Sequence, residues 1–84
     1  MTTNDLKTFF KEHLVPAKLY DLKGAKSNRL CLEHVKDGWN VYFAEKKDKV
    51  GLMHFASEAD ACQTMKEEMR KIMAAIYGLT WSRI

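Results

Sequence analysis

The sequence predicts a single α+β domain, residues 1–84, with an N-terminal helix, a three-stranded antiparallel β-meander and a long C-terminal helix packed on one sheet face. Two patterns predict this class. Apolar residues alternate with a period of two through residues 29–36 and 39–44, and a further apolar run follows at 50–55. Apolar residues instead recur every three or four positions near the N-terminus and through 58–77, which is typical of amphipathic helices.

The first helix is expected in the first dozen residues. Its apolar face would be formed by Leu6, Phe9, Phe10, His13 and Leu14, and its cap would be Thr2, Thr3 or Asn4. Pro16 should end the helix, because the residue before a proline is excluded from helical geometry. The connector that follows contains apolar residues at 19–22 and a loop-like stretch at 24–28, and we expect it to lie over the sheet.

The middle strand determines the register of the sheet. Trp39, Val41 and Phe43 alternate with Asn40 and Tyr42, so the first three are expected to face the helix and the other two the opposite side. A tight turn at residues 36–38 precedes this strand, and a charged loop at 45–48 leads to the next.

The C-terminal helix is expected to span residues 58–77. Ser57, with Asp60 three positions later, resembles a capping sequence, and Gly78 suits a C-terminal stop. Its apolar stripe would pack on the sheet, although its methionines could also form an adaptable binding groove. The stripe consists of Cys62, Met65, Met69, Ile72, Met73 and Ile76. The apolar tail 79–84 should pack on the body or on a partner.

Composition narrows the class of protein. Hydrophobic residues make up 46% of the chain, which includes two Trp, three Tyr and four Phe, so it should fold. It has no apolar run near the roughly 20 residues of a membrane span and no signal-like N-terminus, which favours the cytoplasm. Cys31 and Cys62 are expected to be buried thiols. The net charge of +3 permits an acidic partner.

No motif for catalysis stands out. The histidines His13, His34 and His54 lack an accompanying carboxylate cluster, so no metal site is predicted. The chain contains no Ser, His and Asp motif and no glycine-rich phosphate loop. We therefore expect no enzyme activity and no cofactor.

Three stretches of the chain carry a family resemblance. They are LVPAKLYDL at 14–22, LCLE at 30–33 and GWNVYFAEKKDKVGLMHFASEADAC at 38–62. In this order they resemble small bacterial immunity proteins of toxin systems, including contact-dependent growth inhibition. The resemblance implies a cytoplasmic protein that binds one cognate toxin, occludes its active or partner-binding site, and has no activity of its own.

On this interpretation the toxin would meet the sheet face that the long helix leaves open, together with the charged hairpin tip. Tyr42 would supply an aromatic anchor there, and the charged residues would fix how the toxin is aligned on this surface. The lysines predict an acidic surface on the toxin. The expected contact residues are Asn40, Tyr42, Glu45, Lys46, Lys47 and Lys49. A rival placement is the tail, through Trp81 and Ile84.

An alternative interpretation is a small DNA-binding module that reads the major groove with its three-stranded sheet. In that case Asn40 and Tyr42 would face the bases, and the phosphates would be contacted by Arg29, Lys46, Lys47 and Lys49. Acidic residues at 33, 45 and 48 in the same region, and the low net charge, argue against nucleic acid as the partner.

Overall fold

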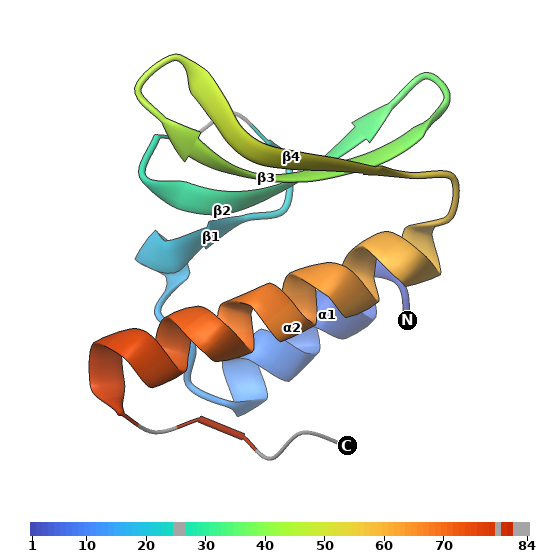
Figure 1. The fold of residues 1–84 in the computed structure, drawn as a ribbon. Coiled ribbons are helices and arrows are strands. Elements are labelled where there is room, and N and C mark those ends of the chain that lie inside the picture. The colour runs from blue at the N-terminus through green and yellow to red at the C-terminus, as the bar shows by residue number, and fades with distance from the viewer. Residues whose placement is uncertain (25–26, 79, 82–84) are drawn as a thin grey trace.

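The computed structural model describes residues 1–24, 27–78 and 80–81 as two helices packed against one sheet. Figure 1 shows the sheet as one layer and both helices side by side beneath it. The elements in chain order are α1 (Thr3–Glu12), the 3-10 turn η1 (Ala17–Leu19), β1 (Tyr20–Asp21), β2 (Arg29–Val35), β3 (Gly38–Glu45), β4 (Asp48–Phe55) and α2 (Glu58–Tyr77).

The α+β class is confirmed, but the sheet has four strands in the order β1-β2-β3-β4. The strands β2, β3 and β4 form the predicted antiparallel meander. The additional strand β1 pairs in parallel with β2, with Tyr20 opposite Leu30 and Asp21 opposite Cys31. The prediction of three antiparallel strands is therefore wrong by one short parallel strand. Two residues are too few to display a period of two, so the pattern in the sequence could not indicate it.

The register predicted for β3 is confirmed. Val41 is fully buried beneath the sheet, and Trp39 and Phe43 pack against the same core. The pairing between β3 and β4 is interrupted by a bulge between Val41 and Phe43. Gly51 and Leu52 of β4 stand there against the single residue Tyr42 of β3, and Gly51 has φ of +65°, a left-handed conformation that glycine adopts without strain.

The main core lies between the sheet and both helices. From α2 it takes Cys62, Met65, Met69 and Met73, so this methionine stripe belongs to the core. Ile76, predicted on the same stripe, is instead 54% exposed. A helix of 20 residues is about 30 Å long, and its last turn extends past the sheet in Figure 1.

Local caps determine where the helices begin and end. Thr2 and Asp5 form a capping box at the start of α1, and Ser57 accepts a hydrogen bond from the Asp60 amide at 3.1 Å to start α2. The predicted bounds of α2 are confirmed, and Gly78 ends it in the left-handed conformation. By contrast, Leu14 has left α1 and is 84% exposed, which corrects its placement on the apolar face.

The tail returns to the body at Trp81. Its ring lies 5.0 Å from that of Phe9 and 5.5 Å from that of His13, both between centroids and both edge-to-face. Leu79 and residues 82–84, including Ile84, lie outside the described residues. Both cysteines are buried thiols, as predicted. Neither helix, within the part of the chain that the structure describes, combines the length and the apolarity of a membrane span.

Candidate functional site

The sheet face turned away from the helices, which we call the outer face, brings together several predicted contact residues. Asn40, Tyr42 and Ala44 point to it from β3, because their neighbours Val41 and Phe43 face the helices. Glu33 joins them from β2, and Lys49 and His54 from β4. The predicted residues Asn40, Tyr42 and Lys49 therefore share one face of the sheet.

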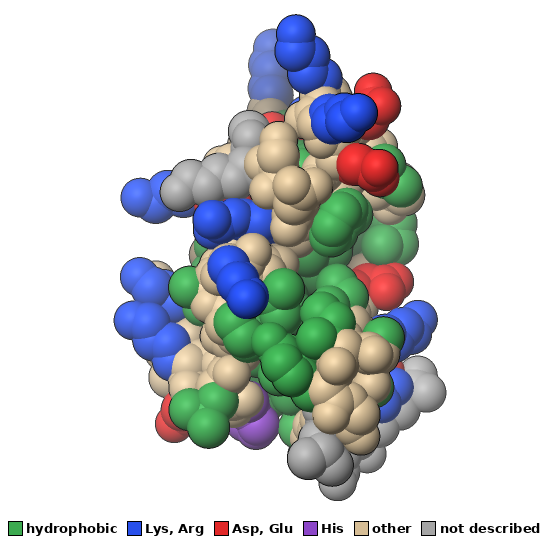
Figure 2. Space-filling view, turned by 90° about the vertical axis from the view of Figure 1, so that its left-hand side faces the viewer, with side chains coloured by type: hydrophobic (Ala, Val, Ile, Leu, Met, Phe, Trp, Pro, Cys, Tyr) green, Lys and Arg blue, Asp and Glu red, His purple; other side chains and the backbone are tan. Residues whose placement is uncertain are grey.

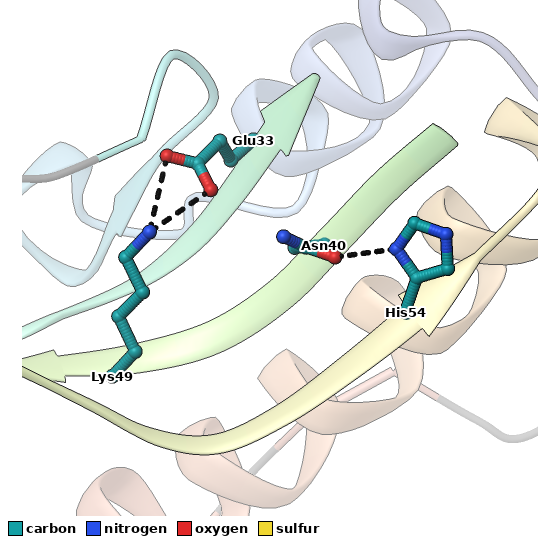
Figure 3. A network of polar contacts seen from close by, with 4 residues as sticks. All are labelled: Glu33, Asn40, Lys49 and His54. Atoms are coloured by element: carbon teal, nitrogen blue, oxygen red, sulfur yellow. Dashed lines mark hydrogen bonds and ion pairs between the residues drawn. The ribbon is translucent and has the colours of Figure 1, made fainter. Parts of the chain in front are cut away.

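Two polar pairs connect the strands across this face, as Figure 3 shows. Lys49 Nζ lies 3.2 Å from Glu33 Oε1, an ion pair that reaches over β3. The hydrogen bond to Glu33 raises the pKa of Lys49 above its ordinary value. His54 Nδ1 lies 2.7 Å from Asn40 Oδ1. Lys49 and Asn40 are thus both engaged within the protein, which limits what they can offer a partner.

Tyr42 lies on the outer face but is only 1% exposed. The Lys49 ammonium lies 5.0 Å from the centroid of its ring, and the connector packs so closely over it that a Cβ placed at Gly24 would come within 3.4 Å of the Tyr42 hydroxyl. The prediction of Tyr42 as a surface anchor is therefore wrong. The sequence predicted that the connector would lie over the sheet, but not that it would cover this ring.

The remaining predicted residues lie at the β3–β4 hairpin tip. Glu45, Lys46 and Lys47 are all exposed there, and the Lys46 carbonyl accepts a hydrogen bond from Ser27 Oγ at 3.0 Å. Asn40 is five residues away from Glu45 along β3, or roughly 17 Å in an extended strand. The six predicted residues therefore occupy two places, the tip and the outer face, and do not form one compact patch.

The structure adds a surface next to the tip that the sequence did not indicate. Residues 48–52 of β4 are exposed, with Val50 at 47% and Leu52 at 45%, and β4 is the last strand of the sheet. A groove of about 200 Å³ separates this stretch from α2, with Val50 and Gly51 on one side and Glu68 and Ile72 on the other. We call Lys46, Lys47, Val50, Gly51, Leu52 and Ile72 the β4 surface.

Figure 2 views the molecule from the end where the β3–β4 hairpin lies. Charged side chains stand at the top of this view and hydrophobic side chains gather below them. Val50 and Leu52 were visible in the sequence as parts of a strand. The predicted meander already placed this strand at an edge of the sheet, and the structure adds the groove that lies between it and α2.

The histidines do not assemble into a metal centre. His34 stacks on Trp39 on the helix side, with ring centroids 4.0 Å apart, whereas His54 lies on the outer face. Across residues 1–24, 27–78 and 80–81, no group of three metal-ligating side chains comes together. Burial raises the pKa of the Cys62 thiol, which disfavours the reactive thiolate.

No protein-family model, no curated protein and no solved structure matches this chain.

Proposed function

We propose that this protein is a cytoplasmic immunity protein that binds a cognate bacterial toxin and occludes the active or partner-binding site of that toxin. Two lines of support meet in this proposal. The ordered resemblance over residues 14–62 points to the immunity class. The observation that carries it is the β4 surface, where Val50 and Leu52 are about half exposed on an edge strand beside a groove.

The β4 surface has the composition of a protein-binding site. Val50 and Ile72 give the groove its apolar part, Leu52 adds a half-exposed apolar side chain on the same edge strand, and the charged hairpin tip forms the rim. An edge strand can also accept a further strand through its backbone amide and carbonyl groups. A toxin segment bound along β4 would gain affinity from these hydrogen bonds and from side chains that enter the groove.

Charge at the tip favours an acidic surface on the toxin. Lys46 and Lys47 are exposed and form no ion pair within the described part of the chain. They are therefore available to accelerate encounter with an acidic partner and to align it. Lys49 is paired with Glu33, so we assign it the role of supporting the surface that contacts the toxin.

The DNA-binding alternative receives less support from the same residues. Tyr42, one of its two base-reading residues, is buried, and Asn40, the other, is bonded to His54. Arg29 donates a hydrogen bond to the Ala17 carbonyl at 3.2 Å instead of extending from the sheet. A sheet placed in the major groove would need these groups to be free.

The test is to co-express the protein with the toxin domain encoded in the neighbouring reading frame, and to measure affinity for the purified, inactivated domain. Val50→Lys and the double variant Lys46→Glu/Lys47→Glu should each weaken binding by about 30-fold, the loss typical of a hot spot. Each should also weaken protection of the cells. The matched control Lys7→Glu/Lys11→Glu makes the same charge change on α1 and should bind normally.

Circular dichroism and urea denaturation would establish that each variant folds. Unchanged toxin affinity in both β4-surface variants would overturn the placement. No protection by the wild-type protein would overturn the immunity function. Tight binding to random duplex DNA that falls steeply with added salt would favour the alternative.

A further inference from the structure

A second concave site lies on a different part of the molecule, between α1 and the β1–β2 region. It has a volume of about 540 Å³, within the usual range of small-molecule pockets. Tyr20, Leu22 and Ala17 give it an apolar part, and Asn4 adds a hydrogen-bonding group. Figure 2 shows lysine and arginine side chains standing along the left-hand outline of the molecule.

Four cationic side chains line this pocket: Lys7, Lys11, Lys23 and Arg29. The single carboxylate among its lining residues is that of Asp21, which already accepts a hydrogen bond from the Lys23 amide at 2.9 Å. None of the four cations forms an ion pair with any residue that the structure describes. Four unneutralised cations around one hollow favour an anionic ligand.

The fold assembles these charges from distant parts of the chain. Lys7 and Lys11 are four residues apart on α1 and therefore lie on the same face of the helix. Lys23 follows β1 and Arg29 begins β2, and both line the pocket together with the two lysines of the helix. Arg29 donates from Nη1 to the Ala17 carbonyl, which holds its guanidinium at the wall of the pocket.

We propose that this pocket binds a small phosphorylated ligand of nucleotide size, with at least two phosphate groups. A guanidinium matches phosphate oxygens in a bidentate geometry, and lysines around it can neutralise the remaining charge. The apolar part formed by Tyr20 and Leu22 suits the organic portion of such a ligand. This site is separate from the β4 surface, and it does not depend on the proposed toxin partner.

The test is calorimetric titration of the full chain with pyrophosphate and with ADP, with adenosine and citrate as comparison probes. Both phosphates should bind saturably, and ADP should bind more tightly than pyrophosphate. The double variant Lys7→Gln/Lys23→Gln should weaken both by at least about 10-fold. The matched double variant Lys46→Gln/Lys47→Gln removes the same charge at the hairpin tip and should change affinity by less than about 2-fold.

Asp21→Asn provides a test in the opposite direction. The amide oxygen can still accept from the Lys23 amide, while the negative charge in the pocket is removed. Affinity for pyrophosphate should therefore rise by about 3-fold or more. Absence of saturable binding up to about 10 mM, far weaker than a specific site requires, would overturn the proposal. An equal loss in both double variants, citrate binding as tight as that of pyrophosphate, or tighter binding of duplex DNA than of ADP would do the same.

Discussion

Thr3 and Glu58 connect the beginnings of the two helices, although they are far apart in the sequence. The Glu58 carboxylate accepts a hydrogen bond from the Thr3 amide at 3.0 Å and another from the Thr3 hydroxyl at 2.8 Å. The negative charge also lies at the N-terminal, positive end of both helix dipoles. These hydrogen bonds lower the pKa of Glu58 below its ordinary value.

This contact predicts a loss of stability in acid. A carboxyl with a lowered folded-state pKa stabilises the fold above its unfolded-state pKa, here about 4.5, and this contribution is lost as the pH falls through the lower folded-state value. Glu58→Ala should reduce the free energy of unfolding at pH 7 by about 1 kcal/mol. It should also flatten the decline below pH 4.5, as measured by urea denaturation. Glu45→Ala, at the exposed tip, is the control. Parallel pH profiles for Glu58→Ala and the wild type would contradict this role.

The methionine stripe predicts that substitutions at different positions of α2 differ strongly in their effect on stability. Met69 is fully buried, so Met69→Ala should lower the free energy of unfolding by about 2–5 kcal/mol because it leaves a cavity. Met69→Asp should unfold the domain, because an unpaired charge in the core costs several kcal/mol. Ile76→Ala, on the exposed last turn, should change stability by less than about 0.5 kcal/mol. Denaturant midpoints would test this, and similar losses at both positions would contradict the packing of α2.

Burial of Tyr42 predicts that it acts in folding and not directly in binding. Tyr42→Ala should lower the free energy of unfolding by about 3 kcal/mol, as truncation of a buried aromatic ring does. Leu52→Ala, about half exposed on neighbouring β4, should cost less than about 1 kcal/mol. Thermal and urea unfolding would measure both. A Tyr42→Ala protein of wild-type stability would show that the connector does not cover the ring in solution.

Gly38 and Gly51 both have positive φ, yet substitution by alanine should destabilise the fold by different amounts at the two positions. A Cβ at Gly38 would collide with the Phe55 carbonyl oxygen, whereas a Cβ at Gly51 meets open space. Gly51→Ala should cost about 1 kcal/mol from backbone strain alone. Gly38→Ala should cost at least about 1 kcal/mol more, because the backbone of β3 or β4 must also shift. Equal stabilities in urea would contradict the close approach at the start of β3.

Some features of this fold are determined by short-range physics and could be read from the sequence. The bounds of α2 depend on Ser57, Asp60 and Gly78, which act on their own helix within a few residues. The faces of β3 depend on alternation alone, so the sequence suffices to predict Trp39, Val41 and Phe43 on the helix side. The exposure of the charged side chains at the hairpin tip could likewise be predicted from the local sequence.

Other features depend on contacts between distant residues, which only the tertiary structure decides. The strand β1 exists because Tyr20 and Asp21 meet β2, and not because of any pattern of their own. Tyr42 is buried because the connector crosses it, so a period of two could assign its side of the sheet but not its exposure. The groove beside β4 depends on the approach of Ile72 in α2 to Val50, and the basic pocket depends on the approach of Lys7 and Lys11 to Lys23 and Arg29. Sequence periodicity reports which face a side chain takes, whereas its neighbours depend on how the whole chain packs.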